Sequence, residues 1–190
     1  NNLIRPDIAL FSGFVSKEII DYCRINSIIP GVIEYNASEC ISCYCDRAEA
    51  FFSALKNLKE KGHKNIGFLP YFRKENLFQD EIKIFNEICR NLNLNSYVKE
   101  NLSENFILSH EIYEVFSEKY IADLLDEHKE ITAIFSSTDV SFIAFKRYLE
   151  KSGKKCPEDI SFMGCDYSPG LKIEGAEIET VKIPRKEMVS

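Results

Sequence analysis

The chain has 190 residues, enough for one domain or two small lobes, and 45% of them are hydrophobic and 28% charged. This composition is typical of a folded globular protein and excludes wholesale disorder and a fibrous class. The formal net charge of -6 argues against a surface that neutralises phosphates, so we do not expect this chain to bind DNA by itself.

The sequence carries no export or membrane signal. No apolar run approaches the length needed to cross a bilayer, and the polar start at Asn1 and Asn2 lacks a signal-peptide pattern. Seven cysteines are an odd number for a disulfide framework, which is typical of small secreted domains. We therefore expect reduced thiols, a cytoplasmic location and no contact with a membrane.

Short apolar runs rich in β-branched or aromatic residues predict strands at 7–11, 30–33, 65–69, 131–136, 160–164 and 178–183. Helical periodicity in the intervening segments predicts helices at 16–26, 46–62, 76–92, 109–127 and 140–151, and the polar stretch 97–108 is expected to be a loop. Uninterrupted apolar strands that alternate with helices are typical of a parallel sheet covered on both faces. The predicted fold class is therefore α/β.

Two patterns that could indicate chemistry have simpler explanations. Cys40, Cys43 and Cys45 have short metal-like spacing, but no histidine or second cysteine pair lies near them, and alternation over 41–45 favours a strand with small buried thiols. His63 follows the helix stop at Gly62, where capping of the last carbonyls or packing is favoured over catalysis. Nucleophile-elbow, phosphate-loop and dinucleotide motifs are absent from the sequence, so we expect no catalysis, metal or cofactor.

Three acidic residues are candidates for a binding site. Glu81 lies on or beside the apolar stripe of its helix, where it either reaches solvent or faces a cleft. Asp139 follows the strand at 131–136 and precedes a helix, so its simplest role is an N-cap. Asp166 follows the strand at 160–164 without a clear helix after it. Because ligands bind beyond the carboxyl ends of strands in open α/β sheets, ligand contact is favoured for Asp166 over a turn-stabilising role.

Two stretches resemble the sensor domains of the lactose/galactose repressor (LacI/GalR) family. Residues 133–139 read AIFSSTD, similar to the family pattern AIF-x-x-ND, and residues 153–166 read GKKCPEDISFMGCD, similar to G-x-x-VP-x-DISV-x-GFD. Stretches at 62–68 and 179–188 fit as well. The resemblance therefore covers essentially the whole chain.

The resemblance implies a two-lobed α/β fold of the type I periplasmic-binding-protein kind, with parallel sheets flanked by helices and a ligand cleft between the lobes. Residues 1–45 would form part of the N-terminal lobe, 46–182 the C-terminal lobe and 183–190 the crossover back. The family domain would start before Asn1 and end after Ser190. The DNA-binding domain would lie upstream, either a helix-turn-helix or, as in some sensors of this type, a winged helix.

The resemblance also implies ligand-binding positions. Asp166 matches the family aspartate that bonds effector hydroxyls, and Thr138 stands where asparagine is usual. In the N-terminal lobe, Ser12, Phe14 and Tyr35 match cleft positions, and many members have an acidic residue in place of the tyrosine.

Glu81 stands where most sugar-binding members have arginine, and Asp139 completes the expected site. Arginine only donates hydrogen bonds whereas an ionised glutamate only accepts them, so a neutral polyol or a cation is favoured over an anionic effector.

The predicted function is therefore the effector-binding and dimerisation domain of a transcriptional regulator. We expect a small-molecule effector, a sugar or related polyol. The other expected partners are a second copy of the chain and DNA, which would be bound through an N-terminal domain. Two alternatives stay open. One is a sugar-binding protein of a transport system with the same fold, and the other is an enzyme that uses Asp139, Asp166 and Glu81 as acid and base.

Overall fold

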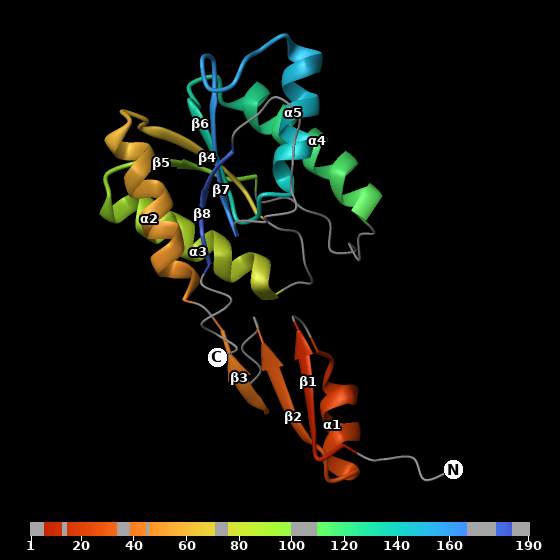
Figure 1. Ribbon diagram of the computed structural model, residues 1–190. Helices are drawn as coiled ribbons and strands as arrows, with labels where there is room; N and C mark the ends of the chain where they lie inside the picture. The colour runs from red at the N-terminus through yellow and green to blue at the C-terminus, as the bar shows by residue number, and fades with distance from the viewer. Residues whose placement is uncertain are drawn as a thin grey trace. The chain divides into compact units, whose positions relative to one another are not determined.

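Strands and helices alternate along the chain in the computed structural model (Figure 1), which describes residues 6–12, 15–33, 39–44, 46–70, 76–99, 110–166 and 178–183. The chain divides into a smaller unit, Asn1–Asp46 with Pro184–Ser190, and a larger unit, Arg47–Ile183. The smaller unit contains β1 Ile8–Ser12, α1 Lys17–Ile25, β2 Ile29–Ile33 and β3 Ile41–Cys43. The larger unit contains α2 Arg47–Glu60, β4 Asn65–Leu69, α3 Asn76–Asn91, β5 Asn95–Tyr97, α4 His110–Glu127, β6 Ala133–Ser136, α5 Ser141–Ser152, β7 Ser161–Cys165 and β8 Glu179–Val181.

The larger unit is built on a five-stranded parallel sheet in the order β5-β4-β6-β7-β8. Helices α2 and α3 lie on one side of this sheet and α4 and α5 on the other (Figure 1). Every residue of β6 and all but the first residue of β4 and β7 are buried. The predicted parallel sheet covered on both faces is therefore confirmed for this unit, because only strands sandwiched between helices can be apolar along their whole length.

Aromatic rings fill the space between the sheet and helices α2 and α3. Phe68 and Phe135 are partners in the register of β4 and β6, and their ring centroids lie 5.6 Å apart. Phe51 of α2 meets Phe135 edge-on at 4.8 Å, and Phe85 of α3 stacks on Phe68 at 4.6 Å. All four rings are fully buried, so this cluster is the centre of the core on that face.

The opposite face of the sheet packs against α4 and α5. At Gly67 a Cβ atom would lie 2.7 Å from Ile134 and 3.1 Å from Leu124 of α4, so the glycine makes room for the helix. Phe142 and Phe145 of α5 contact Phe162 of β7. Both phenylalanines belong to the apolar stripe that the sequence predicts for this helix, and the stripe is buried as expected.

Element boundaries agree with the sequence in most cases and differ where polar residues form structure. The strand at 65–69 is confirmed, and the helix predicted at 140–151 is α5, which ends at Gly153 in a left-handed conformation with φ 68°. Strand β5 is a missed element, because Asn95–Tyr97 has no apolar pattern and lies at the edge of the sheet. The ring of His63 bonds the Thr132 hydroxyl at 3.0 Å instead of the helix carbonyls, and burial is the main cause of its lowered pKa.

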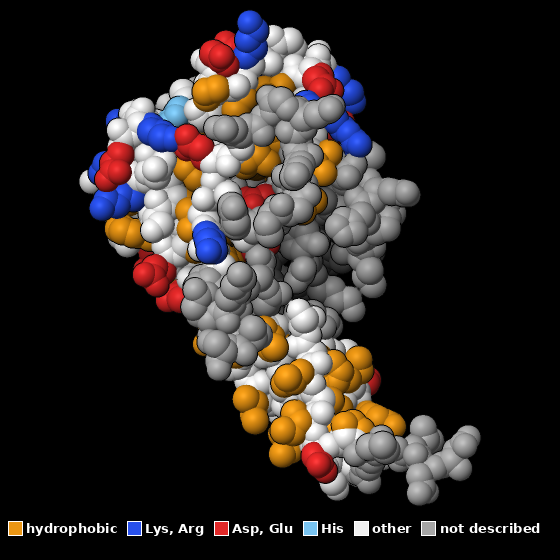
Figure 2. Space-filling view, in the orientation of Figure 1, with side chains coloured by type: hydrophobic (Ala, Val, Ile, Leu, Met, Phe, Trp, Pro, Cys, Tyr) orange, Lys and Arg blue, Asp and Glu red, His pale blue; other side chains and the backbone are white. Residues whose placement is uncertain are grey.

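The smaller unit is a three-stranded parallel sheet, β1-β2-β3, with α1 packed on one face. Val15, Ile20 and Val32 form its buried core. The other face is exposed and largely apolar, as the orange side chains over this unit in Figure 2 show, and it carries Ile8, Leu10, Ile29 and Ile41.

Burial on both faces was therefore the wrong prediction for β1, whose residues alternate in exposure. The prediction of small buried thiols is also wrong for Cys43, because the register places it on the exposed face beside Ile33. Cys40 is partly buried against the α1 core, and Cys45 lies outside the described residues.

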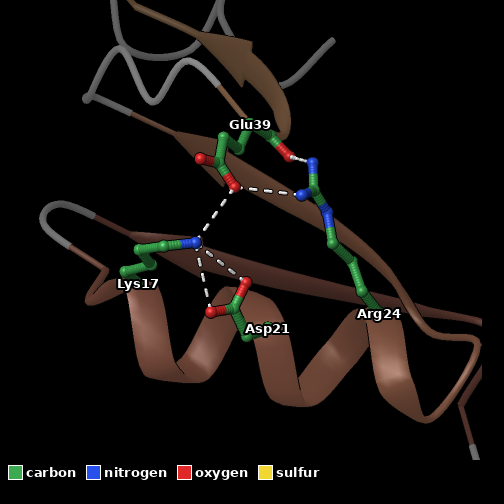
Figure 3. A network of polar contacts seen from close by, with 4 residues as sticks. All are labelled: Lys17, Asp21, Arg24 and Glu39. Atoms are coloured by element: carbon green, nitrogen blue, oxygen red, sulfur yellow. Dashed lines mark hydrogen bonds and ion pairs between the residues drawn. The ribbon is translucent and has the colours of Figure 1, made fainter.

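Exposed ion pairs join α1 to Glu39, two residues before β3. Arg24 donates from Nη1 to Glu39 Oε2 at 2.9 Å and from Nη2 to the Glu39 carbonyl, and Lys17 lies 3.6 Å from the same carboxylate (Figure 3). Lys17 also pairs with Asp21 one turn along the helix. Because all four side chains are exposed, these ion pairs should contribute little to the stability of the fold.

Neighbouring phenylalanines on α2 provide a test of the core. Phe51→Ala removes a fully buried ring from the aromatic cluster and should lower the free energy of unfolding by about 3–5 kcal/mol. Phe52→Ala removes a ring that is 43% exposed and should cost less than about 1 kcal/mol. Urea unfolding followed by circular dichroism measures both changes. Equal losses for the two variants would contradict the position of the core.

Candidate functional site at the carboxyl edge of the larger sheet

The polar and charged side chains of the larger unit gather where its parallel strands end. Strands β6, β7 and β8 run in the same direction, so Ser136, Cys165 and Val181 end at one edge of the sheet. Helix α2 runs back into β4 and helix α3 leaves it, so the first turns of both helices lie at that edge too. Most of the residues that the sequence predicts for a ligand site in this unit lie here.

An ion pair between α2 and α3 lies at this edge. Arg47 Nη1 donates to Glu81 Oε1 at 2.9 Å and to the Ser137 carbonyl at 3.5 Å. The Glu81 side chain is 9% exposed and the Arg47 side chain 36% exposed. The alternative in which Glu81 reaches solvent is therefore wrong, and the carboxylate has a cationic partner that sequence reasoning missed.

The ion pair explains how a glutamate can lie among apolar neighbours of α3 such as Ile82 and Phe85. A charge taken out of water is costly unless an opposite charge compensates for it, and arginine is suited to this because its guanidinium stays charged and donates along fixed directions. The signal for Arg47 in the sequence was weak. It lies 34 positions before Glu81 and looks like an ordinary first-turn residue.

Asp139 bridges three strands. It follows β6, its carboxylate lies over Gly164 of β7, and its Oδ1 accepts a hydrogen bond of 2.6 Å from the Thr180 hydroxyl of β8. Asp139 is 3% exposed. The Phe142 amide donates to the Asp139 carbonyl at 2.9 Å, and Val140 already has helical dihedral angles, so the N-cap role of the Asp139 side chain stays a prediction. Ligand contact by Asp139 stays a prediction, and the structure gives its carboxylate an intramolecular role.

The loop after β6 is fixed by hydroxyl groups. Ser136 donates to the Leu69 carbonyl at 2.8 Å, and the Thr138 backbone amide donates to Ser136 Oγ at 3.4 Å. Thr138, the residue that replaces the usual asparagine, is 6% exposed and is therefore buried. Its predicted contact with a ligand is untested by this geometry.

Asp166, the first residue after β7, has an unusual backbone. Its φ is 127°, a region that residues with side chains rarely adopt, and its amide donates to the Val181 carbonyl at 2.9 Å. The residue is partly buried. Such strain costs about 1–3 kcal/mol and persists only where the surroundings impose it, which is commonest at functional sites.

The charged side chains of Arg47, Glu81, Asp139 and Asp166 all act on the Cys165 thiol. Burial raises its pKa to about 12, the Arg47 charge opposes this, and the carboxylates of Asp166, Asp139 and Glu81 add to it. The four charged groups therefore all lie within electrostatic reach of one buried sulfur atom. A thiol with such a pKa stays protonated at neutral pH and is a poor nucleophile, which counts against covalent catalysis by Cys165.

The remaining predicted residues belong to the smaller unit. Ser12 is the last residue of β1, and Phe14 and Tyr35 lie outside the described residues.

Within the described part of the chain no group of three or more histidine, cysteine or acidic side chains could hold a metal ion. None of the helices described is both long enough and apolar enough to span a bilayer.

A parallel sheet between two helical layers, with charged side chains at its carboxyl edge, defines the class of open α/β ligand-binding domains. The periplasmic binding protein-like domain family matches residues 55–189, most of the chain. The chain belongs to this family. The predicted type I fold and the resemblance to LacI/GalR sensor domains are confirmed by this match together with the relatives that follow.

Two curated relatives are transcriptional regulators by name. The chain is 31% identical over 88 residues to the HTH-type transcriptional regulator MalR of Clostridium butyricum, a match that covers 46% of this chain and 26% of MalR. It is 24% identical over 145 residues to the HTH-type transcriptional repressor CytR of Escherichia coli K12, covering 76% of this chain and 41% of CytR. The matches thus span less than half the length of either relative.

Solved LacI-family regulators have the same fold. CCPA of Weissella paramesenteroides with bound glucose gives a TM-score of 0.77 at 18% identity over 96% of this chain and 67% of that one. A regulator of Enterococcus faecalis with bound ribose gives 0.73 at 20% identity over 97% and 65%. A sugar-binding regulator of Escherichia coli complexed with phosphate gives 0.72 at 22% identity over 96% and 65%.

The bridge made by Asp139 can be tested at Gly164. In Gly164→Ala the added methyl group would overlap the Asp139 carboxylate, whose Cγ lies 3.2 Å from the position of the new Cβ. We expect a loss of about 1–3 kcal/mol in the free energy of unfolding. In the background of Asp139→Ala the same change should cost much less, because the overlapping atoms are gone. Strictly additive losses in urea unfolding of the four proteins would refute the bridge.

Proposed function

We propose that the chain is the effector-binding and dimerisation domain of a DNA-binding transcriptional regulator of the LacI/GalR type, and that its effector is a sugar or related polyol. The observation that carries the proposal is the set of residues at the C-terminal ends of the larger sheet's strands, where Asp166 is held in a strained conformation and Arg47 pairs with Glu81. The names of MalR and CytR support regulation, and the sugars bound to solved relatives support the effector class.

The chemistry of this edge suits a hydroxylated ligand. A hydroxyl group both donates and accepts, so it can donate to the Asp166 carboxylate and accept from a guanidinium. Among the described groups near Cys165, three carboxylates face one arginine. An added anion would meet net repulsion there, whereas a neutral polyol would not. Thr138 and Asp139 would shape the same edge, and Ser12, Phe14 and Tyr35 would contribute from the N-terminal lobe.

Regulation requires no covalent chemistry. An effector that binds one conformation better than another shifts the equilibrium of the dimer between DNA-binding and non-binding states by that difference in affinity. DNA would be contacted through an N-terminal domain, in agreement with the acidic charge of this chain, and the regulator would act in the cytoplasm. The protonated Cys165 thiol and the engagement of Asp139 with Thr180 weaken the enzyme alternative.

A thermal-shift screen of the intact regulator against sugars, polyols, amines and nucleosides would identify the effector, because a ligand that binds only the folded state raises its melting temperature. Calorimetric titration of the best hit then tests the site. Asp166→Gly should weaken binding at least about tenfold, since hydrogen bonds to a charged acceptor are worth about 1.5–3 kcal/mol. The same variant should be more stable without ligand by about 1 kcal/mol, because glycine adopts a φ of 127° without strain.

Glu60→Gln is the matched control, an exposed carboxylate at the opposite end of α2. It should leave both the affinity and the melting temperature unchanged. If Asp166→Gly bound the best hit as tightly as the parent protein, the assignment of the site would be wrong.

A further inference from the structure

Arg47 offers hydrogen-bond donors at the proposed effector site. Within the described part of the chain, both of its hydrogen bonds come from Nη1, to Glu81 and to the Ser137 carbonyl. A guanidinium has five N–H groups in a rigid fork, so fixing one nitrogen also fixes the directions of the others. The Arg47 side chain is 36% exposed while that of Glu81 is 9% exposed. Glu81 is therefore buried in the protein, whereas part of the Arg47 side chain is accessible to a ligand.

Stability alone is a poor explanation for this pair. Burying Glu81 carries a desolvation cost, and replacing a buried ion pair with apolar residues of similar size is often neutral or stabilising. Ile82 and Phe85 show that this part of α3 already faces the core, where an apolar side chain would fit at position 81. What the glutamate provides that an apolar residue cannot is a fixed orientation for the arginine.

Three acidic residues lie at the same strand ends as Arg47. Asp139 accepts from Thr180, and Glu81 accepts from Arg47. Asp166 directly follows β7, so it lies at the same strand ends, and its charge and that of Arg47 act on the Cys165 thiol with opposite sign. A carboxylate and a positioned guanidinium thus lie at the C-terminal ends of the strands of one sheet, and such a pair matches neighbouring hydroxyl groups, one donating and one accepting.

We infer that Arg47 is a specificity-determining donor of the effector site, that Glu81 is its positioning residue, and that the pair selects neutral ligands with neighbouring hydroxyl groups over anionic ones. This inference rests on the proposed function. Glu81 offsets the charge of Arg47, so a phosphate or carboxylate gains little from the arginine and is repelled by Asp166 and Asp139. A neutral diol uses the donors without that repulsion.

The test uses variants that keep the pair balanced. In Arg47→Met with Glu81→Leu, and in Arg47→Leu with Glu81→Met, both charges are removed together and the ion pair is replaced by apolar contacts. Both proteins should fold with melting temperatures within a few degrees of the parent. Arg90→Ala is the control, an arginine in the last turn of α3, at the far end of the helix from Glu81.

Calorimetric titration of the intact regulator would use glucose, ribose and sucrose as neutral probes, with gluconate and ribose 5-phosphate as anionic counterparts. Both double variants should lose at least about tenfold in affinity for the neutral probe that binds the parent best, and the control should not. Glu81→Gln keeps the arginine and removes one negative charge. It should reduce the preference for the neutral probe over its anionic counterpart by about tenfold.

The outcomes separate the two proposals. Parent-like affinity in both double variants, or unchanged preference in Glu81→Gln, would overturn the role of Arg47 while leaving the effector site in place. If no sugar or polyol of the thermal-shift screen bound the parent protein, the proposed sugar effector would itself be refuted.

Discussion

A sheet that is buried on both faces leaves only its strand ends for polar chemistry, and this constraint organises the larger unit. All four residues of β6 are buried, and the aromatic cluster around Phe68 and Phe135 closes one face completely. Charged side chains near the central strands can therefore lie only beyond the strand ends. Because the strands are parallel, their carboxyl ends, the first turn of α2 and the first half of α3 share one edge, and the candidate site follows from that geometry.

The same constraint explains why two aspartates that follow neighbouring strands have different partners. Asp139 lies at the end of β6 with β7 and β8 beside it, and Gly164 leaves the space through which its carboxylate reaches Thr180. Asp166 follows the next strand, β7, whose neighbour β8 is the outermost strand of the sheet. The backbone of Asp166 has a strained conformation. Asp139 therefore joins neighbouring strands, whereas Asp166 is held by its backbone at the C-terminal end of β7.

Local patterns predicted the parts of the molecule that local physics determines. The run at 65–69 reads as a strand because five successive residues fit a buried sheet, and Gly153 marks the end of α5 because a left-handed residue closes it. Pairings over long distances were not predictable in this way. Nothing near Glu81 in the sequence indicates Arg47, 34 positions earlier, and only the fold brings them within 2.9 Å. The open face of the smaller sheet was missed for a similar reason, since the sequence cannot show that α1 covers one side only.

The position of the arginine matters more than its presence. The LacI/GalR resemblance places an arginine at position 81 in most sugar-binding relatives, and this chain has a glutamate there with the guanidinium supplied from α2. The site keeps a donor, but the donor now carries its own counter-charge. A guanidinium without such a partner binds anionic oxygens more strongly than neutral ones. A guanidinium paired with a buried carboxylate loses most of that advantage for anions and keeps its geometry for hydroxyls. Selectivity at this edge therefore depends on the Glu81 charge as much as on the Arg47 donors.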